Sequence, residues 1–431
     1  MADPTKPSRY KTGVLVDLSA VTDSVKSARA VGASWLESLL SSVEAWTTSA
    51  PVLGPYVMED VVLGEGGYGR VVRGRDTTNG EIVAIKELPA GNERRHSAVV
   101  REVAILRRLS DGGKAHPHIV GFRGYFERAD KHYVVMEACM GGELFDKVTG
   151  GEAANMTEAA GGALFAQLVA GLQHAHACGV AHRDLKLENV LMHASGHCAV
   201  SDFGASKRVK PMPLADCRAG DQPPATTRPP GADAIAAGLA PNTTGPAPPL
   251  LATTKSIVGT PAYMAPEMLL AQPYDFAVDW WALGVLFFTM LKGRLPFDAA
   301  EEDKMLWRIV KSKPRYDPDW APETLDVLRS MLQKRPTTRL SSLKTLGHAK
   351  LYASYDWAKL EACKIPPPLV PDLGDDDDRK YVPKRIAETA VPESKLDYKK
   401  GDSMQKLFRK FSHRTSFDDE GVKPPTSTQL Q

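Results

Sequence analysis

The sequence predicts an α+β protein of two lobes, a small β-rich lobe followed by a larger helical lobe with a cleft between them. From Tyr56 onward, short hydrophobic runs alternate with glycine-rich turns, which is typical of strands and hairpins. From about residue 157, helical patterns dominate, apart from short β-type pieces around "NVLMHASGHCAVSDFG". The 431 residues, 43% hydrophobic and 25% charged, fit a globular unit of this size.

Composition and charge exclude several classes of protein. The formal net charge is +2 and no basic stripe dominates, which argues against a nucleic-acid partner. The five cysteines are scattered without metal-ligand spacing, as in a reduced intracellular protein. The N-terminus lacks a signal-peptide pattern, and the apolar run at 280–291 is too short for a membrane span. We therefore expect a buried core helix at 280–291, no membrane partner, and a cytoplasmic protein with access to the nucleus.

The chain divides into three segments, and the second of them contains an insertion. We expect residues 1–55 to form an N-terminal extension with one amphipathic helix, over 24–46. Residues 56–352 are expected to form the main domain, and 353–431 a tail that is largely disordered. Within the main domain, 209–255 holds 10 Pro and 10 Ala among 47 residues and shows no apolar period. Such a composition buries too little surface to offset chain ordering, so we expect a disordered insertion there.

The strand pattern begins with a glycine-rich turn, "GEGGYGRV" at 64–71. Glycines lack a Cβ, so backbone N–H groups at such a turn can approach a polyphosphate closely. Glycine-rich hairpins are also commonly structural, and a strand follows this one, so it is not a Rossmann fingerprint.

A lysine and a glutamate extend this interpretation. Lys86, in "VAIK" on the next strand, could neutralise phosphate oxygens, and Glu102, on a helix predicted over 97–109, could hold it in place. Alone, the lysine could equally be solvated, and the glutamate a surface helix partner.

The stretch "HRDLKLENVL" (182–191) places three chemical groups at the mouth of one short loop. Asp184 can accept or orient the proton of a hydroxyl, Lys186 can stabilise a phosphoryl group in transfer, and Asn189 can bind a metal. Asp202 of "DFG" then offers the main Mg²⁺ ligand. Together these residues predict a phosphoryl-transfer site.

At these residues the chain resembles a eukaryotic serine/threonine protein kinase. The motifs occur in the family's order and include "APE" at 265–267, Asp279 and Arg339, so the resemblance covers about 57–352. The lysine of "HRDLKLEN" and the segment "GTPAYMAPE" are typical of the serine/threonine branch. The subfamily signal is mixed: "AVDWWALGVL" resembles the AGC group, whereas "HRDLKLENVLM" and "KSIVGTPAYMAPEMLL" resemble calcium/calmodulin-type and plant stress-activated kinases.

The resemblance implies that ATP and Mg²⁺ are the cofactors and that the protein is an active enzyme. The alternative hypothesis is a scaffold that binds ATP and acts by contact. Met136 is expected at the back of the adenine pocket, with residues 137–139 as the hinge. The residues expected at the nucleotide are Leu63, Gly64, Glu65, Gly66, Gly67, Tyr68, Gly69, Arg70, Val71, Ala84, Lys86, Met136, Glu137, Cys139 and Glu143.

The resemblance also places the 209–255 insertion inside the activation segment. After it, Ser256 is the expected target of an upstream kinase, with Thr253 and Thr254 as rival sites. Its phosphate would bind Arg183 and Lys207, which Arg94 or Arg95 could join.

Substrate selection is expected to involve three residues. Glu143 and Glu188 match family positions that pair with an arginine upstream of the acceptor hydroxyl, and Thr260 also lies in the peptide-binding region. We therefore expect protein substrates with Ser or Thr acceptors and basic upstream residues. Glu267 and Arg339 are expected to form a buried structural pair.

The tail has two competing interpretations. Residues 356–371 resemble the Pro-rich start of the AGC-type tail, and "LFRKFSH" (407–413) fits that group's hydrophobic motif. Phe408 and Phe411 would then clamp the small lobe, with Ser412 as a second phosphosite. The acidic run at 375–378 departs from this pattern, and a disordered tail is favoured.

Overall fold

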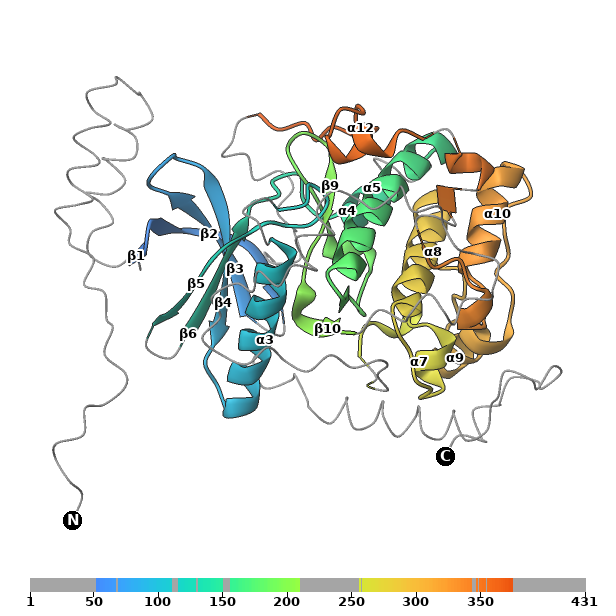
Figure 1. Cartoon of the computed structure of the whole chain (residues 1–431), viewed down its shortest axis with the longest axis horizontal. Coiled ribbons are helices and arrows are strands. Elements are labelled where there is room, and N and C mark those ends of the chain that lie inside the picture. Colours follow the sequence, from blue (N-terminus) through green and yellow to red (C-terminus); the bar gives the residue numbers. More distant parts are fainter. Residues whose placement is uncertain are drawn as a thin grey trace, which may run out of the picture.

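A computed structural model of the chain describes residues 52–374 except 67–68, 111–114, 129–130, 150–155, 210–255, 257, 343–345, 348 and 354. It places a β-sheet lobe beside a helical lobe, which confirms the predicted two-lobed α+β class (Figure 1). The N-terminal helix expected over 24–46, the insertion from residue 210 onward, and Phe408, Phe411 and Ser412 lie outside the described residues.

The small lobe is built on one antiparallel sheet whose strand order is β1-β2-β3-β4-β6-β5. Alternate residues of its strands enter a small core that includes Val72 and Ile85, both 0% exposed. The strands are β1 (Val52–Leu53), β2 (Tyr56–Gly66), β3 (Gly69–Asp76), β4 (Ile82–Pro89), β5 (Phe122–Arg128) and β6 (Lys131–Glu137).

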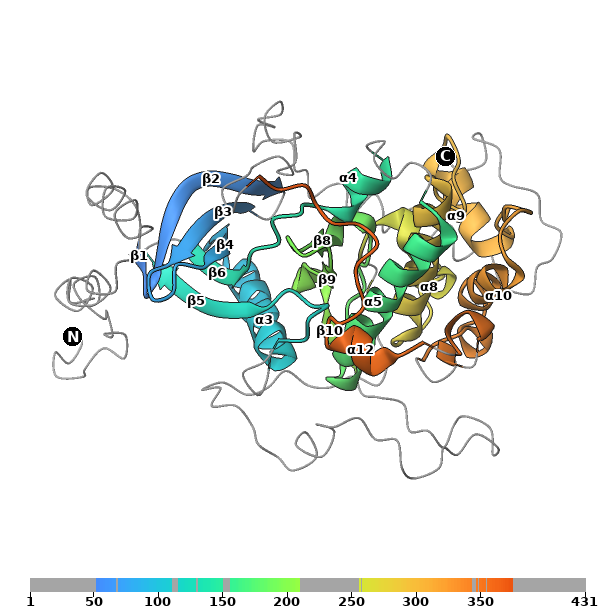
Figure 2. The ribbon, with the colours of Figure 1, turned by 90° about the horizontal axis from the view of Figure 1, so that it is seen from above.

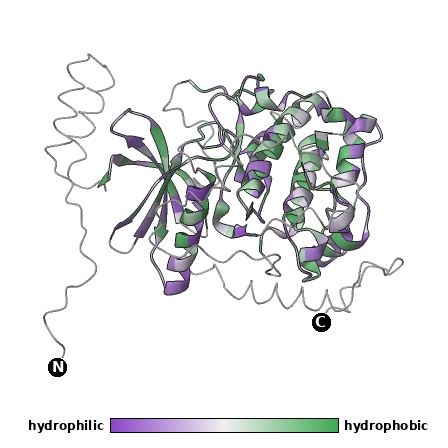
Figure 3. Ribbon diagram, in the orientation of Figure 1, coloured by the Kyte–Doolittle hydropathy of each residue, from purple (hydrophilic) through white to green (hydrophobic). Residues whose placement is uncertain are grey.

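Helix α3 (Glu93–Leu109) packs beside this sheet and buries Val99, Val103 and Leu106. It begins four residues before the predicted start at 97, because the side chain of Asn92 caps it by accepting from the backbone N–H of Arg95. Because the first turn of α3 is made of charged residues, it shows no apolar periodicity, and the sequence pattern therefore did not predict it. Figure 3 shows hydrophilic and hydrophobic turns alternating along α3, as expected for a helix buried on one side.

The large lobe packs helices around α8 (Ala277–Lys292), in which Trp280 and Trp281 are 0% exposed. The buried core helix predicted at 280–291 is therefore confirmed. None of the described helices is both long and apolar enough to cross a membrane. The other helices of four or more residues described here are α4 (Leu144–Thr149), α5 (Glu158–Ala177), α7 (Pro266–Leu269), α9 (Glu302–Lys311), α10 (Pro322–Met331) and α12 (Trp357–Glu361).

Two pairs of short strands flank the loops that lie where the two lobes meet. In one pair, β7 (Val180–Ala181) lies antiparallel to β10 (Lys207–Arg208), and in the other β8 (Val190–Met192) lies antiparallel to β9 (Cys198–Val200). The predicted insertion begins one residue too early, because Val209 is 0% exposed and its N–H donates to Gly179 O at 2.9 Å.

The first part of the predicted tail differs from the expectation of disorder. Residues 355–374 belong to the folded unit: α12 packs against α5 and buries Leu360, and Ile365 O accepts from His197 Nε2 at 3.3 Å. Figure 2 shows the chain running from α12 across the large lobe toward the small one. This part of the tail is ordered because it packs closely against two glycines of the large lobe. A Cβ at Gly141 would lie 2.7 Å from the Pro371 ring, and a Cβ at Gly196 would lie 2.2 Å from Leu369 O.

Candidate active site

Three charged side chains meet where the sheet faces the large lobe. Lys86 Nζ, on β4, lies 2.8 Å from Glu102 Oε1, on α3, and 3.2 Å from Asp202 Oδ1. Burial opposes a charge on Lys86, yet the two carboxylates outweigh it and raise the pKa of the ammonium group. Lys86 therefore carries a fixed positive charge between the carboxylates of Glu102 on α3 and Asp202.

The sheet register puts several expected nucleotide contacts on one face. Val71 lies directly opposite Lys86, and Ala84 lies opposite Met136. Because Ala84 and Lys86 are two residues apart on β4, all four side chains share one face of the sheet.

The glycine-rich hairpin is only partly described. Leu63, Gly64, Glu65 and Gly66 end β2, and Gly69, Arg70 and Val71 begin β3, whereas Gly67 and Tyr68 lie outside the described residues. Gly69 has φ +152°, and a Cβ there would lie 2.0 Å from Glu87 O, so the hairpin needs glycine at this position.

Asp202 begins the 3₁₀ turn η2 (Phe203–Ala205) in the left-handed region, at φ 56°. Burial favours its neutral form, but the Lys86 ammonium prevails and lowers the pKa of the carboxyl, so Asp202 is an anion. A Cβ at Gly204 would lie 3.2 Å from Asp202 Oδ1 and 3.4 Å from Glu102 Oε2. The glycine thus lets α3 approach the acid closely.

Asp184 lies at the centre of a second group, in the loop after β7. Its Oδ1 accepts from the N–H and the Oγ1 of Thr260, at 2.9 and 3.0 Å, and Lys186 Nζ donates to that same Oγ1 at 3.1 Å. Asn189 Nδ2 donates to Asp184 O at 2.7 Å, so its amide oxygen is the atom left for a cation. The structure brings these four residues into one loop cluster.

A buried acid from α8 fixes the backbone of this loop. The carboxylate of Asp279 is 0% exposed and accepts from the N–H groups of His182 and Arg183, at 2.8 and 2.7 Å. His176 Nε2 lies 2.8 Å from the same carboxylate. Burial alone would raise the pKa of Asp279, but the His176 contact lowers it. Because Arg183 has φ 71°, a strained value for a non-glycine residue, this anchor holds the loop in an uncommon conformation.

The segment after the insertion docks onto the same loop. Arg183 Nη1 donates to the hydroxyl of Ser256, which is exposed, at 2.7 Å. Lys207 adds a second cation: burial, followed by the charges of Arg183 and Arg101, lowers its pKa. Helix α3 contributes Arg101, which the sequence did not single out and whose only signal was its position next to Glu102. A contribution from Arg94 or Arg95 stays a prediction.

The two expected substrate carboxylates differ in environment. Glu188 lies in the 3₁₀ turn η1 (Leu187–Asn189), and its Oε2 is buried without a hydrogen-bond partner among the described residues. Burial, and then the Glu188 charge, raise the pKa of nearby Tyr263. Glu143, just before α4, pairs by an isolated bridge with Leu191.

The hinge residues make contacts within the protein. Glu137 Oε1 lies 3.5 Å from His193 Nδ1, and Cys139 Sγ lies 3.9 Å from the same nitrogen. Burial raises the pKa of the Cys139 thiol, which is therefore protonated.

The chain is similar in sequence to known protein kinases. A family model described as a protein kinase domain matches residues 57–222 and 237–351, with its gap inside the predicted insertion. The chain is similar to protein kinase C eta type from Homo sapiens (32% identical over 337 residues, 77% of this chain and 43% of the relative). It is also 28% identical to the RAC serine/threonine-protein kinase of Drosophila melanogaster over 338 residues, 77% of this chain and 48% of that protein.

A third relative, the serine/threonine-protein kinase Sgk1 of Fundulus heteroclitus, is 28% identical over 341 residues, 77% of this chain and 68% of the relative. The chain matches 43% of the length of the protein kinase C eta relatives from mouse, human and rat.

Proposed function

This chain belongs to the protein kinase family, and we propose that it transfers the γ-phosphate of ATP to serine and threonine hydroxyls of protein substrates. The observation that carries the proposal is the pair of adjoining clusters, Lys86–Glu102–Asp202 and Asp184–Lys186–Thr260. One has the charge to hold a polyphosphate, and the other has a base beside a cation for the acceptor hydroxyl. Among subfamilies, the protein kinase C, RAC and Sgk1 relatives favour the AGC group.

The side chains present fit a magnesium nucleotide. The Asp202 carboxylate and the Asn189 amide supply the hard oxygen ligands that Mg²⁺ prefers. The Asp202 side chain is 43% exposed even while it contacts Lys86, so a ligand can reach it. Bound there, Mg²⁺ would neutralise charge on the phosphate oxygens.

The protein's own part in the reaction is positioning and charge stabilisation. We expect Lys86, held by Glu102, to grip phosphate oxygens, and Asp184 to orient the attacking hydroxyl and take up its proton. Lys186 lies 3.6 Å from Asp184 Oδ2, close enough to stabilise the phosphoryl group as it passes to that hydroxyl.

The test is transfer of labelled γ-phosphate to a Ser/Thr peptide library, with Asp184→Asn as the control. Loss of the proton-accepting carboxylate should lower the rate by about 10²–10⁴-fold. If the wild-type chain binds ATP but transfers nothing, the alternative of a scaffold acting by contact replaces this proposal.

We further propose that substrates carry a basic residue upstream of the acceptor. The supporting observation is the buried Oε2 of Glu188, which has no hydrogen-bond partner in the part of the chain that the structure describes and which an arginine of a bound peptide would satisfy. Glu143 is the second expected carboxylate. A library profile with acidic or proline-directed preference would contradict this.

Activation is proposed to occur by phosphorylation of Ser256 by an upstream kinase. Arg183 already contacts the hydroxyl, and Lys207 and Arg101 add positive charge nearby, so a phosphate would order the segment through charge-assisted hydrogen bonds. Ser256→Ala should lower activity, whereas Thr253→Ala and Thr254→Ala, at the rival sites, should not. Full activity of Ser256→Ala would contradict this role.

We also propose that the protein acts in the cytoplasm, with access to the nucleus.

A further inference from the structure

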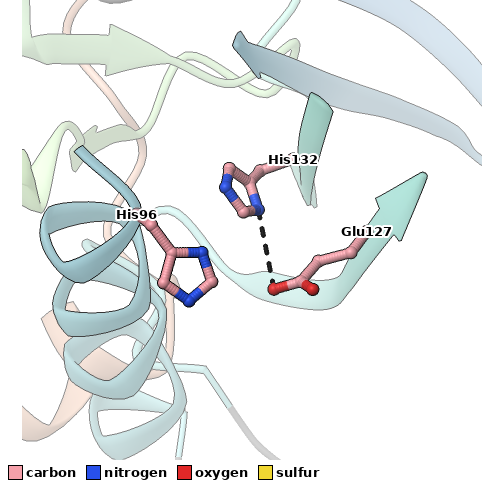
Figure 4. Close-up of side chains that lie close together, drawn as sticks. All are labelled: His96, Glu127 and His132. Atoms are coloured by element: carbon pink, nitrogen blue, oxygen red, sulfur yellow. Dashed lines mark ion pairs between the residues drawn. The ribbon is translucent and has the colours of Figure 1, made fainter. Parts of the chain in front are cut away.

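A second group of metal-binding side chains lies in the small lobe, away from the catalytic residues. His96 on α3, Glu127 on β5 and His132 on β6 point toward one another (Figure 4). One ligand atom from each lies within 4.8 Å of the other two. Among the described residues this is the one such grouping of three or more His, Cys, Asp or Glu side chains.

The backbone prearranges two of the three ligands. Glu127 and His132 are directly opposed across the β5–β6 pair, which places their side chains on one face of the sheet. Glu127 Oε1 lies 3.6 Å from His132 Nδ1. Tetrahedral zinc, with bonds of about 2.1 Å, requires ligand atoms about 3.4 Å apart, so this pair is already near the required spacing.

The third ligand comes from the helix. His96 is exposed, and its ring centroid lies 5.1 Å from that of His132. A small rotation of this exposed side chain brings a nitrogen within bonding reach of a cation held by the strand pair. Its exposure, together with that of Glu127, leaves a fourth position open to water.

The contacts around His132 show which of its two ring nitrogens faces the cluster. His132 is 3% exposed, yet its Nε2 has no hydrogen-bond partner among the described residues, and its Nδ1 contacts the Tyr125 hydroxyl at 2.8 Å. Tyr125 also donates to Glu127 Oε1. On metal binding, the His132 imidazole would change tautomer, with its proton on Nε2 and the Nδ1 lone pair on the cation, while Tyr125 would continue to orient the Glu127 carboxylate.

We propose that His96, Glu127 and His132 form a site for a divalent transition metal, zinc above all, since two imidazoles and one carboxylate match its preferred donors. The cation would join the first turns of α3 to the β5–β6 strand pair. His96 precedes Glu102 by six residues, about 9 Å along the helix, so the metal would also restrain the helix that holds Lys86. This last consequence rests on the proposed kinase activity; the binding itself does not.

The experiment is calorimetric titration of the full, chelator-treated chain with ZnCl₂ in the absence of ATP, paired with Co²⁺ absorption spectra. The wild-type chain should bind one tightly held zinc and give the visible bands of tetrahedral Co²⁺. His96→Ala and Glu127→Gln, both at exposed positions, should each weaken zinc binding at least tenfold.

Two matched controls separate this site from others. Glu93→Gln changes an exposed carboxylate in the same turn of α3, and Asp202→Asn removes the carboxylate expected to bind Mg²⁺; both should retain the wild-type zinc affinity. At a fixed zinc concentration, zinc should also raise the unfolding temperature of the wild-type chain and of both controls by more than that of the two ligand variants. Equal zinc affinity in wild type, His96→Ala and Glu127→Gln, or its loss in Asp202→Asn, would overturn the proposal.

Discussion

Two clusters of carboxylates and cations use the same residue types in opposite ways. In the large lobe, Arg339 Nη1 and Nη2 donate to Glu267 at 2.6 and 2.9 Å, and the two side chains are 0% and 1% exposed. Between the lobes, Lys86 meets Glu102 and Asp202, with the Asp202 side chain 43% exposed.

The two clusters differ in whether their charged groups still have room for a further partner. Arg339 also donates to the carbonyl oxygens of Ala277, Gln333 and Lys334, so no ligand can enter that pair. The Asp202 side chain keeps an open side and can exchange Lys86 for another partner, although Lys86 itself is only 14% exposed. A saturated ion pair fixes the fold, whereas an accessible one can hold a substrate.

The strongest test of this contrast is Lys86→Met. Removing the cation that grips phosphate should lower phosphoryl transfer by about 10³-fold, as loss of one preorganised charge contact does in other enzymes. Lys86→Met also leaves the Glu102 carboxylate, whose side chain is 9% exposed, without its counter-charge, so the unfolding temperature should fall too, and transfer is compared at a temperature where the variant is folded. Steady-state kinetics and calorimetry check this, and an active Lys86→Met would show that the contrast is false.

Glu267→Gln should have the converse effect. It leaves the guanidinium of Arg339 buried without its counter-charge, which costs about 3–5 kcal/mol of folding stability. Thermal unfolding should show a clear drop in the midpoint. At a temperature where the variant is folded, its kcat should stay near that of the wild-type chain. A lowered kcat in fully folded Glu267→Gln would mean that the pair also acts on the site.

A third, uncharged kind of buried group is His118, which is 0% exposed. Burial lowers its pKa to about 4, although Cys198 O accepts a hydrogen bond from Nδ1 at 2.9 Å. Since the unfolded chain binds this proton below a pKa of about 6.5 and the folded chain does not, folding stability should fall as the pH drops from about 6.5 toward 4.

Denaturant unfolding between pH 7.5 and 4.5 measures this loss. His118→Asn keeps a donor for Cys198 O and has no proton to gain, so its stability should depend less on pH, by about one proton per molecule. Parallel pH profiles for the two proteins would exclude His118 as a source of the acid sensitivity.

The smallest expected effect concerns Glu188, a half-buried residue whose Oε2 is buried and has no hydrogen-bond partner among the described residues. Glu188→Gln should raise the KM for a peptide with an upstream arginine by about tenfold, the usual worth of one charged hydrogen bond. Peptides that lack the arginine should show no change. Glu93→Gln, an exposed carboxylate on α3, provides the control, and an equal effect on both peptides would argue against direct recognition.

The sequence by itself determined the fold class, the core helix at 280–291 and the motif residues, because periodicity, glycine turns and charged loops are local signals. It also paired Lys86 with Glu102 correctly in space, since a family resemblance encodes that contact.

Only the tertiary structure decided what depends on contacts between distant segments. Arg101 joins Lys207 and Arg183 because α3 packs against η2, and its position next to Glu102 along the chain does not by itself reveal this. Val209 and residues 355–374 are ordered for the same reason: Gly179, Gly196 and Gly141 offer them backbone partners or close-fitting surfaces. Composition predicted disorder there because it records how much a segment can bury by itself, not what the rest of the fold presents to it.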